Sequence, residues 1–252
     1  MILEEADRRI ELALKVGVPA AILGLWELVS RLGLANPVLL PPPSRVFMVF
    51  VTHPGEVLRN AVTSLYRVLV GYSLAAVLGV GLGILVGTYR TARSALDVVI
   101  ELLRPIPPIA WIPLAILWFG IGDPAAFFII FIGAFFPIFL NTVSGIRNVD
   151  RVYVEAALNL GADDAALIRH VLVTGAMPSI LTGLRVGLGI GWMCVVAAEM
   201  IAAKSGLGYM IIEAQRVLAT DEVIAGMLTI GVLGLLMDRG FRALEGRLLR
   251  WR

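Results

Sequence analysis

Six stretches of this chain are apolar over nearly the length that a helix needs to cross the hydrocarbon core of a membrane, about 20 residues. Of the 252 residues, 59% are hydrophobic and 16% are charged, whereas soluble domains average about 45–50% and about 25%. We therefore predict an all-α polytopic membrane protein with about six transmembrane helices. The net charge of +2 is too small to indicate a nucleic-acid partner. The predicted spans cover residues 14–32, 65–87, 98–120, 125–146, 178–201 and 222–239.

The third predicted span has an irregular first half, with the sequence RPIPPIAWIP. A proline lacks the backbone N–H that continues a helix, so we expect this span to be broken or kinked there. Non-helical backbone at membrane depth is tolerated only where protein or a water-filled cavity surrounds it. The third span is therefore a candidate for lining a passage. Its prolines are Pro105, Pro107, Pro108 and Pro113.

The basic residues are concentrated in alternate predicted loops. Lysine and arginine are enriched in cytoplasmic loops, so their distribution predicts that both termini, and the segment between the fourth and fifth spans, lie in the cytoplasm. The basic residues assigned to the cytoplasm are Arg8, Arg9, Lys15, Arg90, Arg93, Arg147, Arg151, Arg169, Arg239, Arg242, Arg247, Arg250 and Arg252. The outer segments receive Arg31, Arg45, Arg59, Lys204 and Arg216, while Arg67, Arg104 and Arg185 fall near or within spans.

The external loop after the first span contains a triple proline in the sequence LLPPPSRVFMVFVTHPGEVLRNAVTS. Ser44 is suited to the N-cap of a helix, and Pro54 to the first turn of a second one. We expect two short interfacial helices in this loop. We divide the chain into a first span with its external loop, a transmembrane core and a basic cytoplasmic tail, at residues 1–60, 61–240 and 241–252.

The sequence excludes the Walker A phosphate loop from this chain. That loop requires a Gly-Lys pair, whereas Lys15 and Lys204 follow a leucine and an alanine. There is also no HExxH motif, no GxSxG motif in a strand-to-helix context and no cysteine pair. The histidines, His53 and His170, fall on opposite sides of the predicted membrane, so we expect no metal site. We predict that the chain is not an enzyme and binds no cofactor itself.

Glycines recur every four residues in the second and the fifth predicted spans. Small residues at this spacing form a flat helix face that another helix can approach closely. We therefore interpret both series as helix-packing faces and not as cofactor-binding loops. The two series are Gly79, Gly83 and Gly87, and Gly183, Gly187 and Gly191.

A charged, alanine-rich segment, EAALNLGADDAALIRHVLVTGAMPSILTG, separates the fourth and fifth spans. Its apolar residues recur at helical spacing, which predicts an amphipathic element. Gly161 suits the left-handed conformation that ends a helix, and Asp163 suits the N-cap of the next. We expect two short helices that meet at a bend and fit a groove in a partner protein. The alternative is a helix lying on lipid, which Glu155, Asp163 and Asp164 disfavour because the inner leaflet is anionic.

The sequence EAALNLGA, followed by MPSILTGLR, resembles the EAA loop of binding-protein-dependent ABC importer permeases with the type I, MetI-like fold. That family commonly has a proline where this chain has Thr174, although Pro178 matches a second proline often found four residues later. Other segments are similar to the nitrate, sulfonate and taurine group of these permeases, so that the resemblance covers nearly the whole chain. These segments are LPPPSRV, SLYRVLVGY, RPIPPIAWIPLAILWFGIG, WMCVVAAEMIAAKSGLGYMI and GLLMDRGFRALEGRLLRW.

The resemblance implies a permease subunit of an ATP-driven importer in a prokaryotic inner membrane. It implies a second permease copy, forming a homodimer, two cytoplasmic ATPases that bind ATP and Mg²⁺, and an external substrate-binding protein. The solute would be a small anion such as nitrate, a sulfonate, taurine or bicarbonate, although some relatives carry pyrimidines or riboflavin. The loop 153–173 would dock on the ATPase. Its coupling residues would be Glu155, Ala156, Ala157, Leu158, Asn159, Gly161, Ala162, Asp163, Asp164 and Arg169.

The proline-broken third span and the glycine-lined fifth span are the parts predicted to line the passage. Charged residues inside a membrane are functional hypotheses by default. Glu199 and Arg185 in the fifth span are therefore either functional groups or members of structural pairs. The predicted passage residues are Pro108, Trp111, Pro113, Trp192 and Glu199.

Two other classes of membrane protein compete with the importer. An ATP-independent secondary transporter or channel would also have broken spans, but it needs no cytoplasmic docking element and commonly has inverted repeats, which are not detectable here. An intramembrane enzyme requires a convergent set of polar groups, and Glu199 stands nearly alone in its span. No motif distinguishes a sulfonate from a nitrate, because selection in such importers falls largely on the external binding protein.

Overall fold

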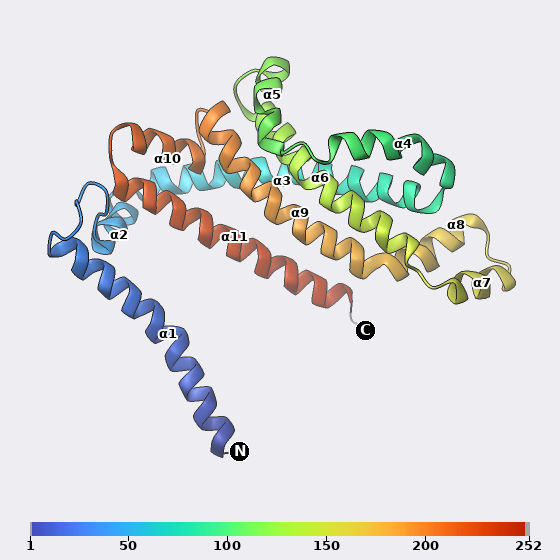
Figure 1. Ribbon diagram of the computed structural model, residues 1–252, viewed down its shortest axis with the longest axis horizontal. Coiled ribbons are helices and arrows are strands. Elements are labelled where there is room, and N and C mark those ends of the chain that lie inside the picture. The colour runs from blue at the N-terminus through green and yellow to red at the C-terminus, as the bar shows by residue number, and fades with distance from the viewer. Residues whose placement is uncertain (1, 250–252) are drawn as a thin grey trace. The chain divides into compact units, whose positions relative to one another are not determined.

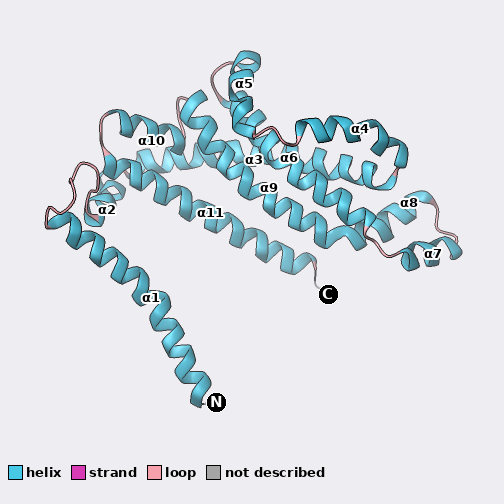
Figure 2. Cartoon of the chain, viewed as in Figure 1, coloured by secondary structure: helices cyan, strands magenta, loops and turns pink. Residues whose placement is uncertain are grey.

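The computed structural model describes residues 2–249, which form helices and connecting loops without a strand in that range (Figures 1 and 2). Each long helix corresponds to an apolar stretch of the sequence, and the loops between them contain most of the glycines with positive φ. The helices are α1 (Ile2–Arg31), α2 (Pro43–Thr52), α3 (Pro54–Thr88), α4 (Arg90–Leu103), α5 (Ile112–Phe119), α6 (Asp123–Arg147), α7 (Arg151–Asn159), α8 (Asp164–Ala166), α9 (Val173–Ala202), α10 (Leu207–Arg216) and α11 (Thr220–Leu248).

The chain divides into two compact units. The first comprises Met1–Leu58 and Met210–Leu228, and the second comprises Arg59–Tyr209 and Thr229–Arg252. All of the predicted coupling, passage and packing residues belong to the second unit, so this unit positions the candidate site.

Helix α6 lies at the centre of the second unit, between α3 and α9 (Figure 1). On one side, a Cβ atom placed on Gly83 of α3 would lie 2.6 Å from the Cβ atom of Thr142. On the other side, a Cβ atom on Gly187 of α9 would lie 2.7 Å from a side-chain carbon of Ile138. These separations leave no room for a larger residue, so the glycines set the distance between the helices. The other glycines of the two series also lie against α6: Gly79, Gly87, Gly183 and Gly191.

The contacts also fix the directions of the helices in the second unit. Helix α3 runs parallel to α6, α9 runs antiparallel to α6, and α11 runs antiparallel to α9. The C-terminal ends of α3, α6 and α11 and the N-terminal end of α9 therefore lie at one end of this unit. The contacting pairs are Gly71 with Ile130 and Gly87 with Ile146 for α3 and α6, Gly183 with Asn141 and Gly191 with Ile130 for α6 and α9, and Trp192 with Ile230 and Arg185 with Asp238 for α9 and α11.

The third predicted span is broken at its prolines, as expected. Helix α4 ends at Leu103, and the next helical segment, a 3-10 turn over Pro108–Trp111 that continues into α5, leaves it at 89°. Pro105 and Pro107 lie in this break and Pro108 begins the 3-10 turn, and none of the three can donate the backbone hydrogen bond of a continuing helix. The extent of the element differs from the prediction, because α4 begins at Arg90 and not near residue 98.

Four helices in the described range are long and apolar enough to cross a membrane, and the bent pair makes a fifth if it counts as one span. The four are α3, α6, α11 and the continuous helix Asp164–Ala202 that contains α9. The predicted fifth span, 178–201, lies within this helix, which continues through Pro178 from the N-terminal side. The first predicted span, 14–32, overlaps α1 up to Arg31 and stays a prediction.

The predicted external loop contains one short helix and not two. Pro54 begins the 35-residue helix α3 instead of a separate interfacial helix. Ser44 is not an N-cap, because α2 already begins at Pro43. The backbone N–H and the hydroxyl of Ser44 instead donate to the Glu27 carboxylate, with donor–acceptor distances of 3.0 and 2.8 Å. A charged acceptor from α1 therefore satisfies the first donors of α2, which a side-chain cap would otherwise do.

Two parts of the sequence interpretation fall at or beyond the limits of the described residues. The predicted basic tail, 241–252, continues α11 as far as Leu248, and Arg250 and Arg252 lie outside the described range. Arg8 and Arg9, which contribute to the predicted orientation, belong to the residues whose side chains are not described. The division of the chain at residues 60 and 240 stays a prediction.

Candidate functional site

The turn between α7 and α8 has the conformation that the sequence predicts. Gly161 has φ +86°, its N–H donates to the Leu158 carbonyl over 3.0 Å, and the next N–H donates to the Ala157 carbonyl over 3.0 Å. This pair of bonds is the Schellman ending, which needs a left-handed residue that glycine supplies without steric cost. Asp163 then accepts a hydrogen bond of 2.7 Å from the Ala166 N–H as the N-cap of α8.

The coupling residues predicted from the sequence gather on this turn, at the end of the second unit where α6 and α9 are joined (Figure 1). All of α7 lies in the described chain, and none of its residues is buried. Several exposed residues are large and apolar, among them Leu160 at 89%, Val152 at 66% and Tyr153 at 65% exposure. Such a face is available for a partner protein.

The second helix of this segment is longer than the sequence predicts. Helix α8 does not end after one turn but continues through a π-helical turn, Leu167–Leu172, into α9. Arg169 lies in the π turn and is exposed. The segment is therefore one short helix, a bend and the start of a 39-residue helix. π turns are common at functional sites, but no residue pattern in this stretch signals one.

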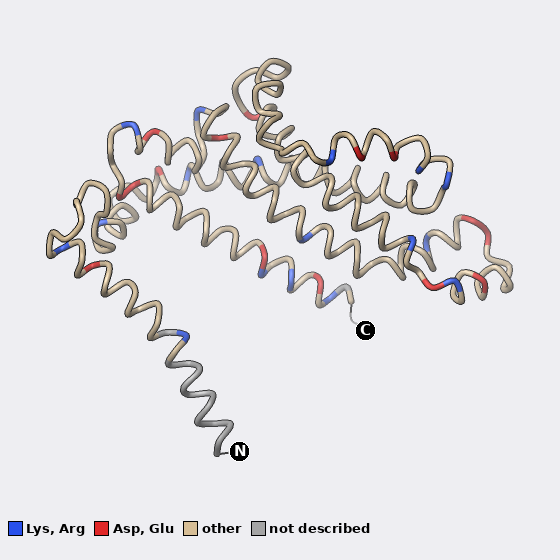
Figure 3. Tube along the Cα trace, viewed as in Figure 1, with Lys and Arg blue, Asp and Glu red and all other residues tan. Residues whose placement is uncertain are grey.

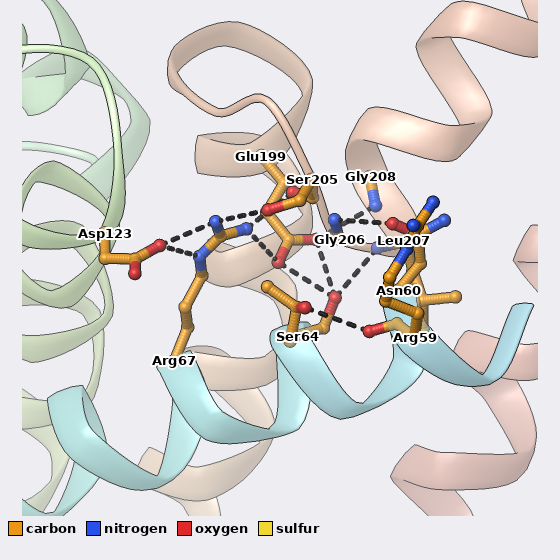
Figure 4. Close-up of polar contacts among 11 residues, drawn as sticks. Arg59, Asn60, Ser64, Arg67, Asp123, Glu199, Ser205, Gly206, Leu207 and Gly208 are labelled. Atoms are coloured by element: carbon orange, nitrogen blue, oxygen red, sulfur yellow. Dashed lines mark hydrogen bonds and ion pairs between the residues drawn. The ribbon is translucent and has the colours of Figure 1, made fainter. Parts of the chain in front are cut away.

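A buried ionic cluster joins three helices at the opposite end of the second unit (Figure 4). Its centre is Arg67 on α3, whose side chain is 3% exposed. Its Nη1 donates to Glu199 Oε1 on α9 over 2.9 Å, and its Nε donates to Asp123 Oδ1 on α6 over 2.8 Å. It also donates to the backbone carbonyl of Ser205 over 2.6 Å and to the hydroxyl of the same residue over 2.9 Å. One guanidinium thus ties together α3, α6, α9 and the loop after α9.

Glu199 was predicted to face the passage, but the structure encloses it in this cluster. The residue is fully buried, and its carboxylate accepts hydrogen bonds from the Ser64 hydroxyl over 2.8 Å and the Gly208 N–H over 2.9 Å as well as from Arg67. Gly206 has φ +105°, and a Cβ atom there would collide with this carboxylate. The structural-pair interpretation of Glu199 is therefore the one that the contacts favour.

Sequence reasoning missed the partners of Glu199. Arg67 and Asp123 belong to other spans, 132 and 76 positions away in the chain. The usable signals were a lone arginine inside an apolar stretch and the Ser-Gly-Leu-Gly sequence that begins at Ser205, where glycines allow backbone to approach a buried group closely.

The five predicted passage residues do not come together in the second unit. Pro108 lines an open groove of about 380 Å³ between the α4–α5 break and α6. Trp111 packs edge-on against a phenylalanine of α6, with ring centroids 6.2 Å apart. Pro113 is exposed, and Trp192 lines a separate small pocket of about 70 Å³. The groove at Pro108 is larger than the pocket at Trp192. It lies at the broken span, where the sequence predicts the wall of a passage.

Comparisons with known proteins identify the class of membrane protein. The chain is 48% identical over 250 residues to a putative ABC transporter permease of Methanocaldococcus jannaschii, covering 96% of this chain and 93% of that protein. It is 40% identical over 248 residues to the taurine transport system permease protein TauC of Escherichia coli, covering 96% and 90%. It is 38% identical over 237 residues to a putative aliphatic sulfonates transport permease protein, SsuC, of Bacillus subtilis, covering 93% and 86%.

The fold is also similar to that of a solved ABC transporter chain. A chain of the MetNI methionine ABC transporter, in an inward-facing conformation, matches with a TM-score of 0.61 and 20% identity, covering 75% of this chain and 99% of that chain. At this identity the likeness concerns the fold alone, and it confirms the predicted MetI-like fold.

The sequence profile described as "Binding-protein-dependent transport system inner membrane component" matches residues 79–250, which contain the broken span, the α7–α8 turn and both glycine series. Membership in this family confirms that the chain is a transport subunit and not an enzyme. It also implies partner ATPase and binding-protein subunits. The chain belongs to the family of inner-membrane components of binding-protein-dependent transport systems and is a multi-pass ABC permease subunit.

Proposed function

We propose that this permease imports a small sulfonate-type anion, delivered by an external binding protein and driven by ATP hydrolysis on a separate subunit. The observation that carries the substrate class is the 40% identity to the taurine permease TauC, which extends over 96% of this chain. The likeness to the aliphatic sulfonates permease supports the same class. Taurine and alkylsulfonates share one sulfonate group, so a common passage would have to accommodate three oxygens with one negative charge.

Energy would enter through the exposed turn between α7 and α8. We infer that Glu155 to Arg169 dock in a groove of the ATPase, because this segment combines rigid helix ends with exposed apolar residues. The left-handed Gly161 and the Asp163 cap hold the bend without a partner, so the docking element is preorganised. Movement of this turn would reach the passage directly, because it continues without interruption into α9.

The orientation that we propose places this turn, and both chain termini, in the cytoplasm. The end of the second unit that includes the turn also carries basic residues at the start of α4, at the end of α6 and along the last turns of α11 (Figure 3). Cytoplasmic segments of membrane proteins are enriched in lysine and arginine. The opposite end of this unit carries fewer basic residues, namely Arg59, Lys204 and the enclosed Arg67.

We further propose that two copies of the chain form the passage. The groove at the α4–α5 break is open on one side, and α4 has no buried residue in the described chain. A second copy would cover these faces and close the path by a symmetric, self-complementary contact.

The test is transport by the complete complex in proteoliposomes. The permease, its ATPase and its binding protein are reconstituted together, and ATP-dependent uptake of labelled taurine, an alkylsulfonate, nitrate and bicarbonate is measured. Vesicles without the binding protein and vesicles without ATP serve as controls. We expect uptake of taurine and of the alkylsulfonate only when both the binding protein and ATP are present. Uptake that continues without ATP would contradict the importer mechanism, and import of nitrate or bicarbonate alone would contradict the sulfonate assignment.

A further inference from the structure

The groove beside the α4–α5 break is at the middle of a membrane span. It is lined by Phe136, Pro137 and Asn141, which lie near the centre of the 25-residue helix α6. Most of its other lining residues are apolar. Arg104 also lines it, at the end of α4 just before the chain turns through 89°. An arginine therefore stands at membrane depth in the wall of the candidate passage.

Among the described residues, Arg104 has no side-chain partner, unlike the other two arginines that lie near or within predicted spans, Arg67 and Arg185. Its residue is exposed, and its guanidinium forms no hydrogen bond or ion pair with any residue in the described range. Arg67 is enclosed by acceptors, and Arg185 pairs with Asp238 over 2.7 Å. Glu101, one turn earlier on α4, is not paired with Arg104 either.

An unpaired arginine is energetically costly at the centre of a membrane. Charged residues at such depth commonly face a water-filled cavity and mark the path of an ion or substrate. The open groove supplies the cavity here. The missing acceptor would then be a molecule that enters the groove, and its charge would be negative.

We propose that Arg104 binds the sulfonate group of the solute as it crosses the passage. The inference rests on the proposed import of sulfonates. The planar guanidinium presents parallel N–H donors that match two oxygens of an oxyanion. Asn141, on the facing wall, is held by a hydrogen bond of 2.8 Å from its Nδ2 to the Pro137 carbonyl, which leaves its second N–H for another acceptor. Arg104 contacts the solute directly and takes no part in ATP hydrolysis, which occurs on the partner ATPase.

The test compares single substitutions in the reconstituted complex. Arg104→Gln removes the charge, and Arg104→Lys keeps the charge but loses the paired donors. Arg93→Gln removes an arginine from the same helix that does not line the groove. Taurine uptake and ATP hydrolysis are measured in the same vesicles, at equal amounts of incorporated permease and saturating binding protein.

We expect Arg104→Gln to lower taurine uptake by about tenfold or more, the loss expected for a hydrogen bond to a charged group. Arg104→Lys should retain more uptake than the glutamine variant, and Arg93→Gln should transport like the unchanged protein. ATP hydrolysis should not fall in any variant. A change confined to transport separates recognition of the solute from a role in folding or docking.

Three outcomes would overturn the proposal. If the Arg104→Gln complex imports taurine at the rate of the unsubstituted complex, the guanidinium does not bind the solute. A parallel loss of uptake and ATP hydrolysis would indicate a structural role. Equal defects in Arg93→Gln would show a general effect of charge on α4. If the unchanged complex imports no sulfonate, the proposed function fails as well, whereas normal import with an inert Arg104→Gln refutes only the role of Arg104.

Discussion

Gly206 offers a quantitative test of the ionic cluster that joins α3, α6 and α9. Its φ of +105° is unfavourable for any residue with a Cβ atom, and a Cβ atom there would collide with the Glu199 carboxylate. Gly206→Ala therefore combines two effects, backbone strain and displacement of a buried charge. Gly33, which ends α1, separates them, because it also has a positive φ, +70°, but no described heavy atom lies within 4 Å of a Cβ atom placed on it.

The strain costs about 1 kcal/mol for a residue in the left-handed region. Displacing the carboxylate of Glu199 weakens its bonds to Arg67 and to the Gly208 N–H, at about 1.5 kcal/mol each for hydrogen bonds to a charged group. We therefore expect Gly206→Ala to cost about 4 kcal/mol and Gly33→Ala about 1 kcal/mol. For chains of this size, 1 kcal/mol corresponds to about 2–4 °C in the unfolding midpoint.

The assay is thermal unfolding of the purified permease in detergent or nanodiscs, followed by loss of the folded peak in size-exclusion chromatography. Gly206→Ala should lower the midpoint by about 8–16 °C and Gly33→Ala by about 2–4 °C. Both variants are heated at the same rate, because unfolding of membrane proteins is commonly irreversible. Equal shifts in the two variants would refute the view that the Glu199 carboxylate fills the space beside Gly206.

The remaining predictions concern helix packing and coupling. Gly83→Leu should prevent stable folding because its Cβ atom would lie 2.6 Å from Thr142. Gly81→Leu, with no described neighbour within 4 Å, should accumulate normally in membranes. Similar yields of the two variants in membranes would contradict the packing of α3 against α6. Gly161→Val should insert but lose ATP-driven uptake, while an asparagine at this site should retain part of it because asparagine tolerates the left-handed region; normal uptake by the valine variant would refute the coupling role of the bend. A cysteine at Asn159 should crosslink to the ATPase with a yield that changes on trapping ATP, and a cysteine at Glu56 should not; efficient crosslinking from Glu56 would overturn the orientation.

Some features follow from the sequence because they depend on residues close together in the chain. Membrane insertion follows from the length of the apolar stretches. The break before α5 follows from prolines that cannot donate backbone hydrogen bonds. The bend at Gly161 and its cap at Asp163 follow from local backbone preferences. The four-residue spacing of the glycines places them on one face of a helix, whatever that face contacts. Each of these is a property of one helix or one turn.

The extents of the helices were less predictable. A proline at the start of a stretch fits either a short helix or a long one, so Pro54 did not reveal that α3 runs on for 35 residues. Pro178 suits the start of a helix, but α9 continues through it. Ser44 is a residue type that commonly caps a helix, but here its backbone N–H and hydroxyl donate to the Glu27 carboxylate of α1.

Only the tertiary structure decided which charged residues are paired and which are not. Glu199, Arg67 and Arg104 look alike in the sequence, each as one charge in or near an apolar stretch. Packing of α3 parallel to α6 and of α9 antiparallel to it brings Glu199 and Arg67 within 2.9 Å, although 132 positions separate them. The 89° turn after α4 leaves Arg104 at an open groove. Local preference cannot specify such distances, because they depend on how closely the glycine faces allow the helices to approach and on which residues then meet across the contact.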